Sequence, residues 1–131
     1  MRVYMSCFLL LTLTFISGCK SGSRTSASGP LIGKLVISEI CNHFVVAVES
    51  GKIDPAKLTG HFRDEKRAAE FTRVFTVVNS CSFAQAGIKE GDRFYFETTP
   101  ARINQDCMVC MAYYPTPAAS LSIINIKKIN P

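Results

Sequence analysis

The sequence predicts an all-β domain, a small barrel or sandwich of five to six strands with short helical insertions. Six short runs rich in β-branched and aromatic residues follow one another, separated by Gly, Pro, Asn and Ser. Residues 64–70 contain good helix formers but no apolar face of any width, which predicts an exposed loop or a short helix. Helix therefore contributes little to the expected fold.

Each expected element has a local signal in the sequence. Only Cys41 and Asn42 separate the first two apolar runs, which indicates a hairpin or a sharp strand bend. Asp54 as an N-cap, with Pro55 at the first helical position, predicts one helical turn over 54–58. A further short turn is expected over 84–87. The expected strands, in chain order, are 35–40, 43–49, 71–78, 92–98, 108–114 and 121–129.

Aromatic residues in the fourth expected strand alternate between its two faces. Phe94 and Phe96 share one face and Tyr95 takes the other. If the phenylalanines fill the core, Tyr95 points outward together with one of Tyr113 and Tyr114. These three tyrosines are the candidate binding face, suited to a glycan or a protein. The alternative to a binding face is ordinary barrel packing, in which a tyrosine at the rim of the barrel makes a hydrogen bond.

The segment Ile16-Ser17-Gly18-Cys19 closes an apolar run that begins at Cys7, after a short start with the cation Arg2. It resembles the signal of bacterial lipoproteins. The resemblance implies cleavage between Gly18 and Cys19, with fatty chains such as palmitate on the Cys19 sulfur and the new amino terminus. The alternative is an uncleaved transmembrane helix, but the run has about 10 residues and a span needs about 20.

The signal and the composition together predict how the chain is divided. Residues 1–18 are expected to be the lipoprotein signal peptide, and 31–131 the β-barrel domain. Residues 19–30, rich in Ser and Gly, are expected to be a flexible tether. Lys20 follows Cys19 with no acid nearby, which by resemblance to enteric lipoprotein sorting implies delivery to the outer membrane. The formal net charge is +5, but acids interleave with most cations, so nucleic acid is not an expected partner.

The segment 87–94 resembles the loop that leads into the fourth strand of many OB-fold barrels. Together with 75–83, Cys107-Met108-Val109-Cys110 and Pro115-Thr116-Pro117, it also resembles a group of small Bacteroidota lipoproteins of unassigned function. The resemblance covers about residues 33–126 and implies an OB-like barrel and an envelope address, but no activity. His61-Phe62 stands where that group is expected to have Trp.

Four cysteines lie beyond Cys19, and an even number in an exported chain predicts two structural disulfides. Strand positions three apart face opposite sides, so Cys107 and Cys110 are expected to pair with Cys41 and Cys81, in an order left open. The first alternative is a redox site at Cys107 and Cys110. The second is a zinc site in which Cys41 and His43, two apart on one strand face, join the later cysteines.

No residue pattern indicates catalysis. Neither His43 nor His61 has a nucleophile beside it in the sequence, and Asp64-Glu65 and Glu90/Asp92 are expected to be solvated loop groups. The sequence therefore predicts a lipid-anchored cell-envelope protein with a binding or structural role, no enzymatic activity and no cofactor. Its partners would be the membrane, through the N-terminal lipid, and a glycan or protein ligand. The alternative is an envelope thiol–disulfide or metal-binding protein using Cys107 and Cys110.

Overall fold

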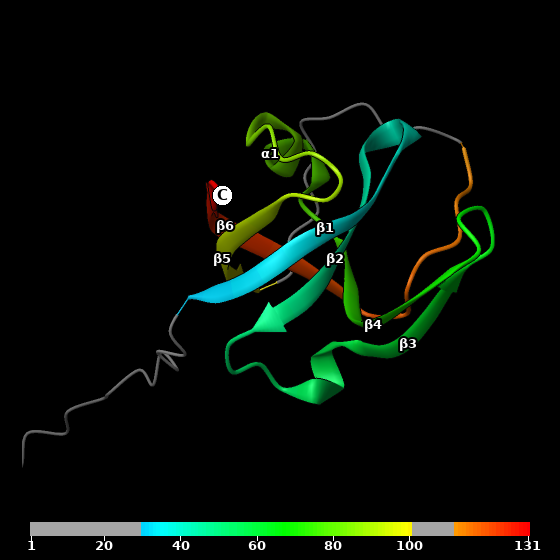
Figure 1. Cartoon of the computed structure of the whole chain (residues 1–131), viewed down its shortest axis with the longest axis horizontal. Coiled ribbons are helices and arrows are strands. Elements are labelled where there is room, and N and C mark those ends of the chain that lie inside the picture. The colour runs from blue at the N-terminus through cyan, green and yellow to red at the C-terminus, as the bar shows by residue number, and fades with distance from the viewer. Residues whose placement is uncertain (1–29, 101–111) are drawn as a thin grey trace, which may run out of the picture.

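Five strands close into a ring, and a sixth strand extends one of them as a hairpin arm (Figure 1). The computed structural model describes residues 30–100 and 112–131. The elements, in chain order, are β1 (Leu31–Glu39), η1 (Ile40–Asn42), β2 (His43–Ser50), η2 (Pro55–Lys57), β3 (Thr59–Asp64), β4 (Ala69–Val77), α1 (Ser80–Gln85), β5 (Arg93–Thr99) and β6 (Ser120–Lys128).

Strand pairing defines the ring. β1 pairs antiparallel with β2 and β5, β2 with β4, and β5 with β6, while the short β4–β6 ladder is parallel and closes the circuit. β3 pairs only with β4. The expected all-β class is confirmed, and a closed ring with one helix between β4 and β5 is the OB-like arrangement.

The barrel core is built from alternating inward positions. Phe94 and Phe96 are fully buried while Tyr95 is 38% exposed, as the alternation predicted. The two phenylalanine rings lie 5.7 Å apart, and Phe83 of α1 packs against Phe94 at 5.6 Å, so the helix seals the core at one end. Gly33 also faces inward, and a Cβ there would come within 2.9 Å of the Phe96 ring.

The turn between β1 and β2 confirms the predicted hairpin. Cys41 and Asn42 both have left-handed backbone, with φ of 65° and 55°. Such turns suit the right-handed twist of paired strands, and Asn tolerates this conformation better than most residues. The predicted turn at Asp54 is also present: its Oδ1 accepts a hydrogen bond from the Ala56 backbone N–H at 2.9 Å.

Three sequence predictions differ from the structure. Residues 59–64 form the unpredicted strand β3, and of the loop or short helix expected over 64–70 only 65–68 lie outside strands, as the turn of the β3–β4 hairpin. Residues 112–114 are not in a strand, and the rest of the expected strand 108–114 lies outside the described residues. The short turn expected over 84–87 is the end of a longer element, because helix α1 begins at Ser80 and places Phe83 in the core.

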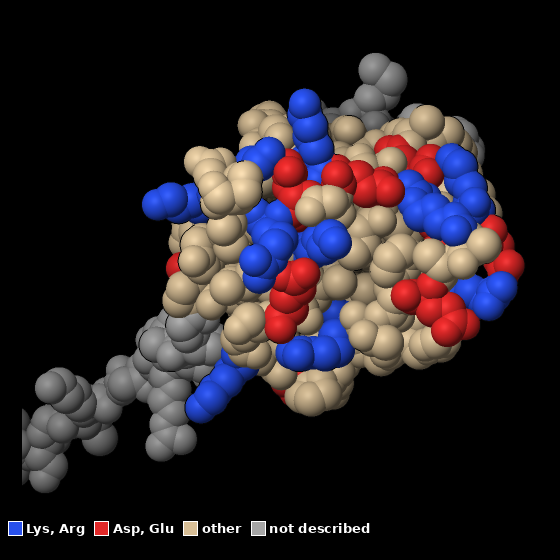
Figure 2. Space-filling model, in the orientation of Figure 1, with Lys and Arg blue, Asp and Glu red and all other residues tan. Residues whose placement is uncertain are grey.

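The exposed surface carries charges of both signs. On the face shown in Figure 2, basic and acidic side chains lie next to one another, and no broad area has one sign. Ion pairs at the surface include Arg93 with Glu49 and Lys128 with Asp92. Within residues 30–100 and 112–131, no helix combines the length and apolar character needed to cross a bilayer.

Candidate functional site

The outer face of β2 is covered by the chain itself. Ligands of OB-type barrels commonly bind the outer face of the second and third ring strands, here β2 and β4. In this protein Val45 and Val74, which lie on that face, are fully buried. Phe62 and Phe71 of the β3–β4 hairpin pack over them, with Tyr114 from the segment before β6. This outer face is therefore a second, smaller core, and the role of β3 in the fold is to help cover it.

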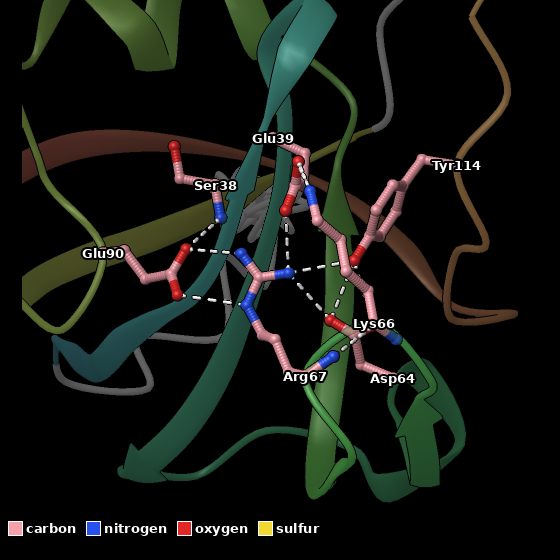
Figure 3. Close-up of polar contacts among 7 residues, drawn as sticks. All are labelled: Ser38, Glu39, Asp64, Lys66, Arg67, Glu90 and Tyr114. Atoms are coloured by element: carbon pink, nitrogen blue, oxygen red, sulfur yellow. Dashed lines mark hydrogen bonds and ion pairs between the residues drawn. The ribbon is translucent and has the colours of Figure 1, made fainter.

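The hairpin is held in place by charged groups that we call the Arg67 cluster: Glu39, Asp64, Lys66, Arg67, Glu90 and Tyr114 (Figure 3). Asp64 ends β3 and is only 3% exposed. Its Oδ1 accepts hydrogen bonds from the backbone N–H of Lys66 at 3.0 Å and of Arg67 at 3.4 Å. Asp commonly makes such bonds to the residues that follow it in a turn. They fix the turn so that the Arg67 side chain returns toward the barrel.

The Arg67 guanidinium contacts three carboxylates from three parts of the chain (Figure 3). Its Nη1 lies 2.9 Å from Asp64 Oδ2 and 2.9 Å from Glu39 Oε1. Its Nε and Nη2 donate to the two oxygens of Glu90 at 3.1 and 2.8 Å, a bidentate pair. Glu90 Oε2 also accepts from the Ser38 backbone N–H at 2.9 Å. The hairpin turn is thus joined to β1 and to the loop before β5.

These contacts keep the cluster ionised at neutral pH. The hydrogen bonds with Glu90 raise the pKa of Arg67, and the Arg67 guanidinium lowers the pKa of Glu90. Lys66 Nζ lies 2.7 Å from Glu39 Oε2, and this hydrogen bond is the main reason that the pKa of Glu39 is lowered. Each carboxylate therefore contacts a cation, and the three carboxylates share the two cations Lys66 and Arg67.

Tyr114 brings the segment before β6 to the same cluster. Its hydroxyl donates to Asp64 Oδ2 at 2.8 Å and accepts from Arg67 Nη1 at 2.9 Å. Burial, followed by the hydrogen bond to Asp64, raises the pKa of Tyr114 to about 12. Burial also acts to raise the pKa of Asp64, but the hydrogen bonds from Tyr114 and Arg67 outweigh it and leave this pKa lowered.

His43, at the start of β2, packs behind the cluster. Its ring centroid lies 4.8 Å from that of Tyr114, with the planes tilted by 44°. Its Nε2 is buried and has no hydrogen-bond partner among the described residues. Burial lowers the pKa of His43, Glu39 and Asp64 act to raise it, and Arg67 acts to lower it. The neutral imidazole is therefore the form that the fold favours, and its role here is packing.

The Arg67 cluster is suited to holding the β3–β4 hairpin on the barrel rather than to proton transfer. Its carboxylates are held in the ionised state, and its guanidinium is already shared among three of them. The expectation that Asp64 is a solvated loop group is wrong, since hydrogen bonds stabilise it in a nearly fully buried position. The charged run Arg63-Asp64-Glu65-Lys66-Arg67 was the only local signal, and it does not reveal Glu39, Glu90 or Tyr114 as partners.

The three candidate tyrosines do not form one face. Tyr113 is 90% exposed and Tyr95 is 38% exposed, whereas the Tyr114 hydroxyl is bonded within the Arg67 cluster. Tyr95 pairs with Ile32 near the start of β1, and the cluster lies at Glu39, seven residues along that strand. At about 3.3 Å per residue the two ends of β1 are roughly 23 Å apart. Tyr95 and Tyr113 are therefore separate exposed rings.

Two of the four predicted cysteine sites lie within the described residues. Cys41 and Cys81 are both in disulfide-bonded form, and the Cys81 Sγ lies 3.9 Å from the Asn42 side-chain nitrogen, where α1 contacts η1. Cys107 and Cys110 lie outside the described residues, so the pairing remains a prediction. Cys41 lies in η1 and not on a strand, so the expectation that it shares a strand face with His43 is wrong.

Metal binding finds no support in the described part of the chain. A disulfide-bonded sulfur is not the thiolate that zinc needs. No group of three or more His, Cys, Asp or Glu residues within 30–100 and 112–131 is arranged to hold an ion. No family model, no curated protein and no solved structure matches the chain.

Proposed function

We propose that this chain is a lipid-anchored cell-envelope protein of the outer membrane, with a binding or structural role and no catalytic one. The observation that carries the proposal is Ile16-Ser17-Gly18-Cys19 at the end of the apolar run. Cleavage before Cys19 and acylation there would tether a folded domain through fatty chains. Two or more such chains give stable anchoring, where one binds only marginally.

The position of the barrel fits this arrangement. β1 begins at Leu31, so residues 20–30 separate the proposed lipid from the first strand. Eleven residues span at most about 40 Å when fully extended. The barrel would therefore stay close to the membrane, which is a suitable distance for a partner in the same envelope layer.

Several properties of the barrel favour binding or a structural role. The Arg67 cluster uses its charged groups to hold four chain segments together. The mixed charge on the face in Figure 2 supports a protein, glycan or small-molecule partner over nucleic acid, whose backbone needs a basic stripe. The rival proposal, an envelope thiol–disulfide or metal-binding protein, rests on Cys107-Met108-Val109-Cys110 and requires free thiols there.

The anchoring is tested by comparing Cys19→Ala with Cys7→Ala, which removes a cysteine from the apolar run of the same signal. Cells expressing each full chain are fed an alkyne-tagged fatty acid and then fractionated. Wild type and Cys7→Ala should carry the label in the membrane fraction, and Cys19→Ala should carry none. Equal labelling of Cys19→Ala and wild type would contradict the proposal.

A further inference from the structure

An apolar cavity lies between η2 and the β3–β4 hairpin. Its volume is about 190 Å³, and it is lined by Ile53, Pro55, Leu58, Gly60 and Arg73. For comparison, a cavity of about 150 Å³ lined by apolar side chains holds a benzene ring. One wall is fixed by the capped turn η2, which contacts β3, and the other by the hairpin that the Arg67 cluster holds down.

Arg73 is the only arginine in the described part of the chain that lacks a carboxylate partner. Arg63, Arg67 and Arg93 each contact at least one carboxylate. Arg73 is exposed, and its side chain makes no ion pair or hydrogen bond with the described residues. It also has left-handed backbone, with φ of 54°, although it is neither Gly nor Asn. Non-glycine residues held in such conformations cluster at active sites, ligand clamps and switch regions.

Gly60 lies opposite Arg73, between the paired positions Thr59↔Val74 and His61↔Thr72. A Cβ added at Gly60 would meet no atom within 4 Å, and its backbone is not left-handed. Neither space nor conformation therefore requires glycine at this strand position. Glycine weakens strands and often marks a place where a ligand approaches the backbone. Its absent side chain leaves this side of the cavity open.

We propose that this cavity binds a small carboxylate with an apolar body, such as an aryl- or short-chain alkyl carboxylate. The body contacts Ile53, Pro55 and Leu58, and the carboxylate pairs with the Arg73 guanidinium, which presents two parallel N–H donors to such a group. The inference deepens the proposed function by naming a ligand class. It rests on the binding role in that proposal and is independent of the lipid anchor.

The test is a titration of the full chain in detergent solution, which needs no lipid anchor, followed by methyl NMR at Ile53 and Leu58. The probe is 3-phenylpropionate. 3-Phenylpropanol has the same body without the charge, and acetate has the charge without the body. We expect saturable shifts with 3-phenylpropionate and at least about tenfold weaker binding of the other two. Equal binding of the alcohol, or no saturable shift by about 10 mM, would overturn the proposal.

Three variants locate the site. Gly60→Leu should fill the opening and abolish the shifts. Arg73→Gly suits the left-handed backbone, so it should keep the fold and lose the preference for the carboxylate over the alcohol. Arg63→Ala removes a cation from the same hairpin and should bind as wild type does. Unchanged binding by Gly60→Leu or Arg73→Gly would overturn the assignment. These outcomes are independent of the fatty-acid labelling at Cys19, so the two proposals can fail separately.

Discussion

Replacing Arg67 with alanine tests whether the Arg67 cluster fastens the hairpin to the barrel. The change leaves Asp64, with 3% of its side chain exposed, and Glu39, with 10%, without their shared cation. Breaking a buried ion pair by removing one partner costs about 3–5 kcal/mol. Asp64 keeps its hydrogen bond from Tyr114, and Glu39 keeps Lys66, so we expect the lower part of that range or slightly less, about 2–3 kcal/mol.

The assay is urea unfolding followed by circular dichroism, with Arg93→Ala as the matched control. Arg93 pairs with Glu49 on the surface, where their side chains are 53% and 34% exposed, and such pairs contribute about 0–1 kcal/mol. Arg67→Ala should therefore lower the free energy of unfolding by at least about 1 kcal/mol more than Arg93→Ala does. Equal losses in the two variants would refute the fastening role.

The same urea unfolding, repeated at low pH, tests whether Arg67 acts through its charge. The pKa values of Asp64 and Glu90 are lowered in the folded protein, so these groups contribute stability above their unfolded pKa, about 4. That contribution is lost as the pH falls through the lower pKa values that Asp64 and Glu90 have in the folded protein. The difference between wild type and Arg67→Ala should accordingly narrow below about pH 4. A difference that stays constant down to pH 2 would mean that charge is not what Arg67 contributes.

Two further predictions concern the core and the cluster. Phe96→Ala should lower the free energy of unfolding by about 3–5 kcal/mol, because it empties a filled core position. Tyr95→Ala should lower it by less than about 1 kcal/mol, because Tyr95 is on the outer face. Comparable losses in denaturant unfolding would mean that both faces of β5 are in the core. Burial lowers the pKa of His43, so wild type should lose thermal stability as the pH falls below about 6.5, where the unfolded chain takes up a proton. His43→Phe should abolish this loss and His61→Phe should retain it; an unchanged pH profile in His43→Phe would contradict the packing role of the neutral imidazole.

Local chemistry made part of the fold predictable from the sequence. The alternation at Phe94 and Tyr95 has a period of two, the Asp54 cap lies two residues from the N–H that it binds, and Cys41-Asn42 leaves room only for a tight turn. β3 was not predictable in this way. It packs one face on the barrel and leaves the other in solvent, so Phe62 is its only large apolar residue and Gly60 interrupts its pattern.

The site was harder to predict because its contacts are distant along the chain. Arg67 is 23 residues from Glu90 and 47 from Tyr114. The charged residues next to Arg67 in the sequence do not differ from those found in an ordinary solvated turn. The cavity at Arg73 has the same difficulty, since its lining comes from a capped turn and two strands that meet only when the hairpin folds over. That Arg73 has no carboxylate partner among the described residues, and that Gly60 is not required by space or conformation, can be recognised only from the folded structure.

The most direct test of the proposed function is the mass of the mature amino terminus. The wild-type protein is isolated from the outer-membrane fraction, digested, and its N-terminal peptide is measured by mass spectrometry. The proposal predicts a peptide that begins at Cys19 and carries fatty chains on the sulfur and the amino group. A peptide that begins at Met1, or one that begins at an unmodified Cys19, would contradict it.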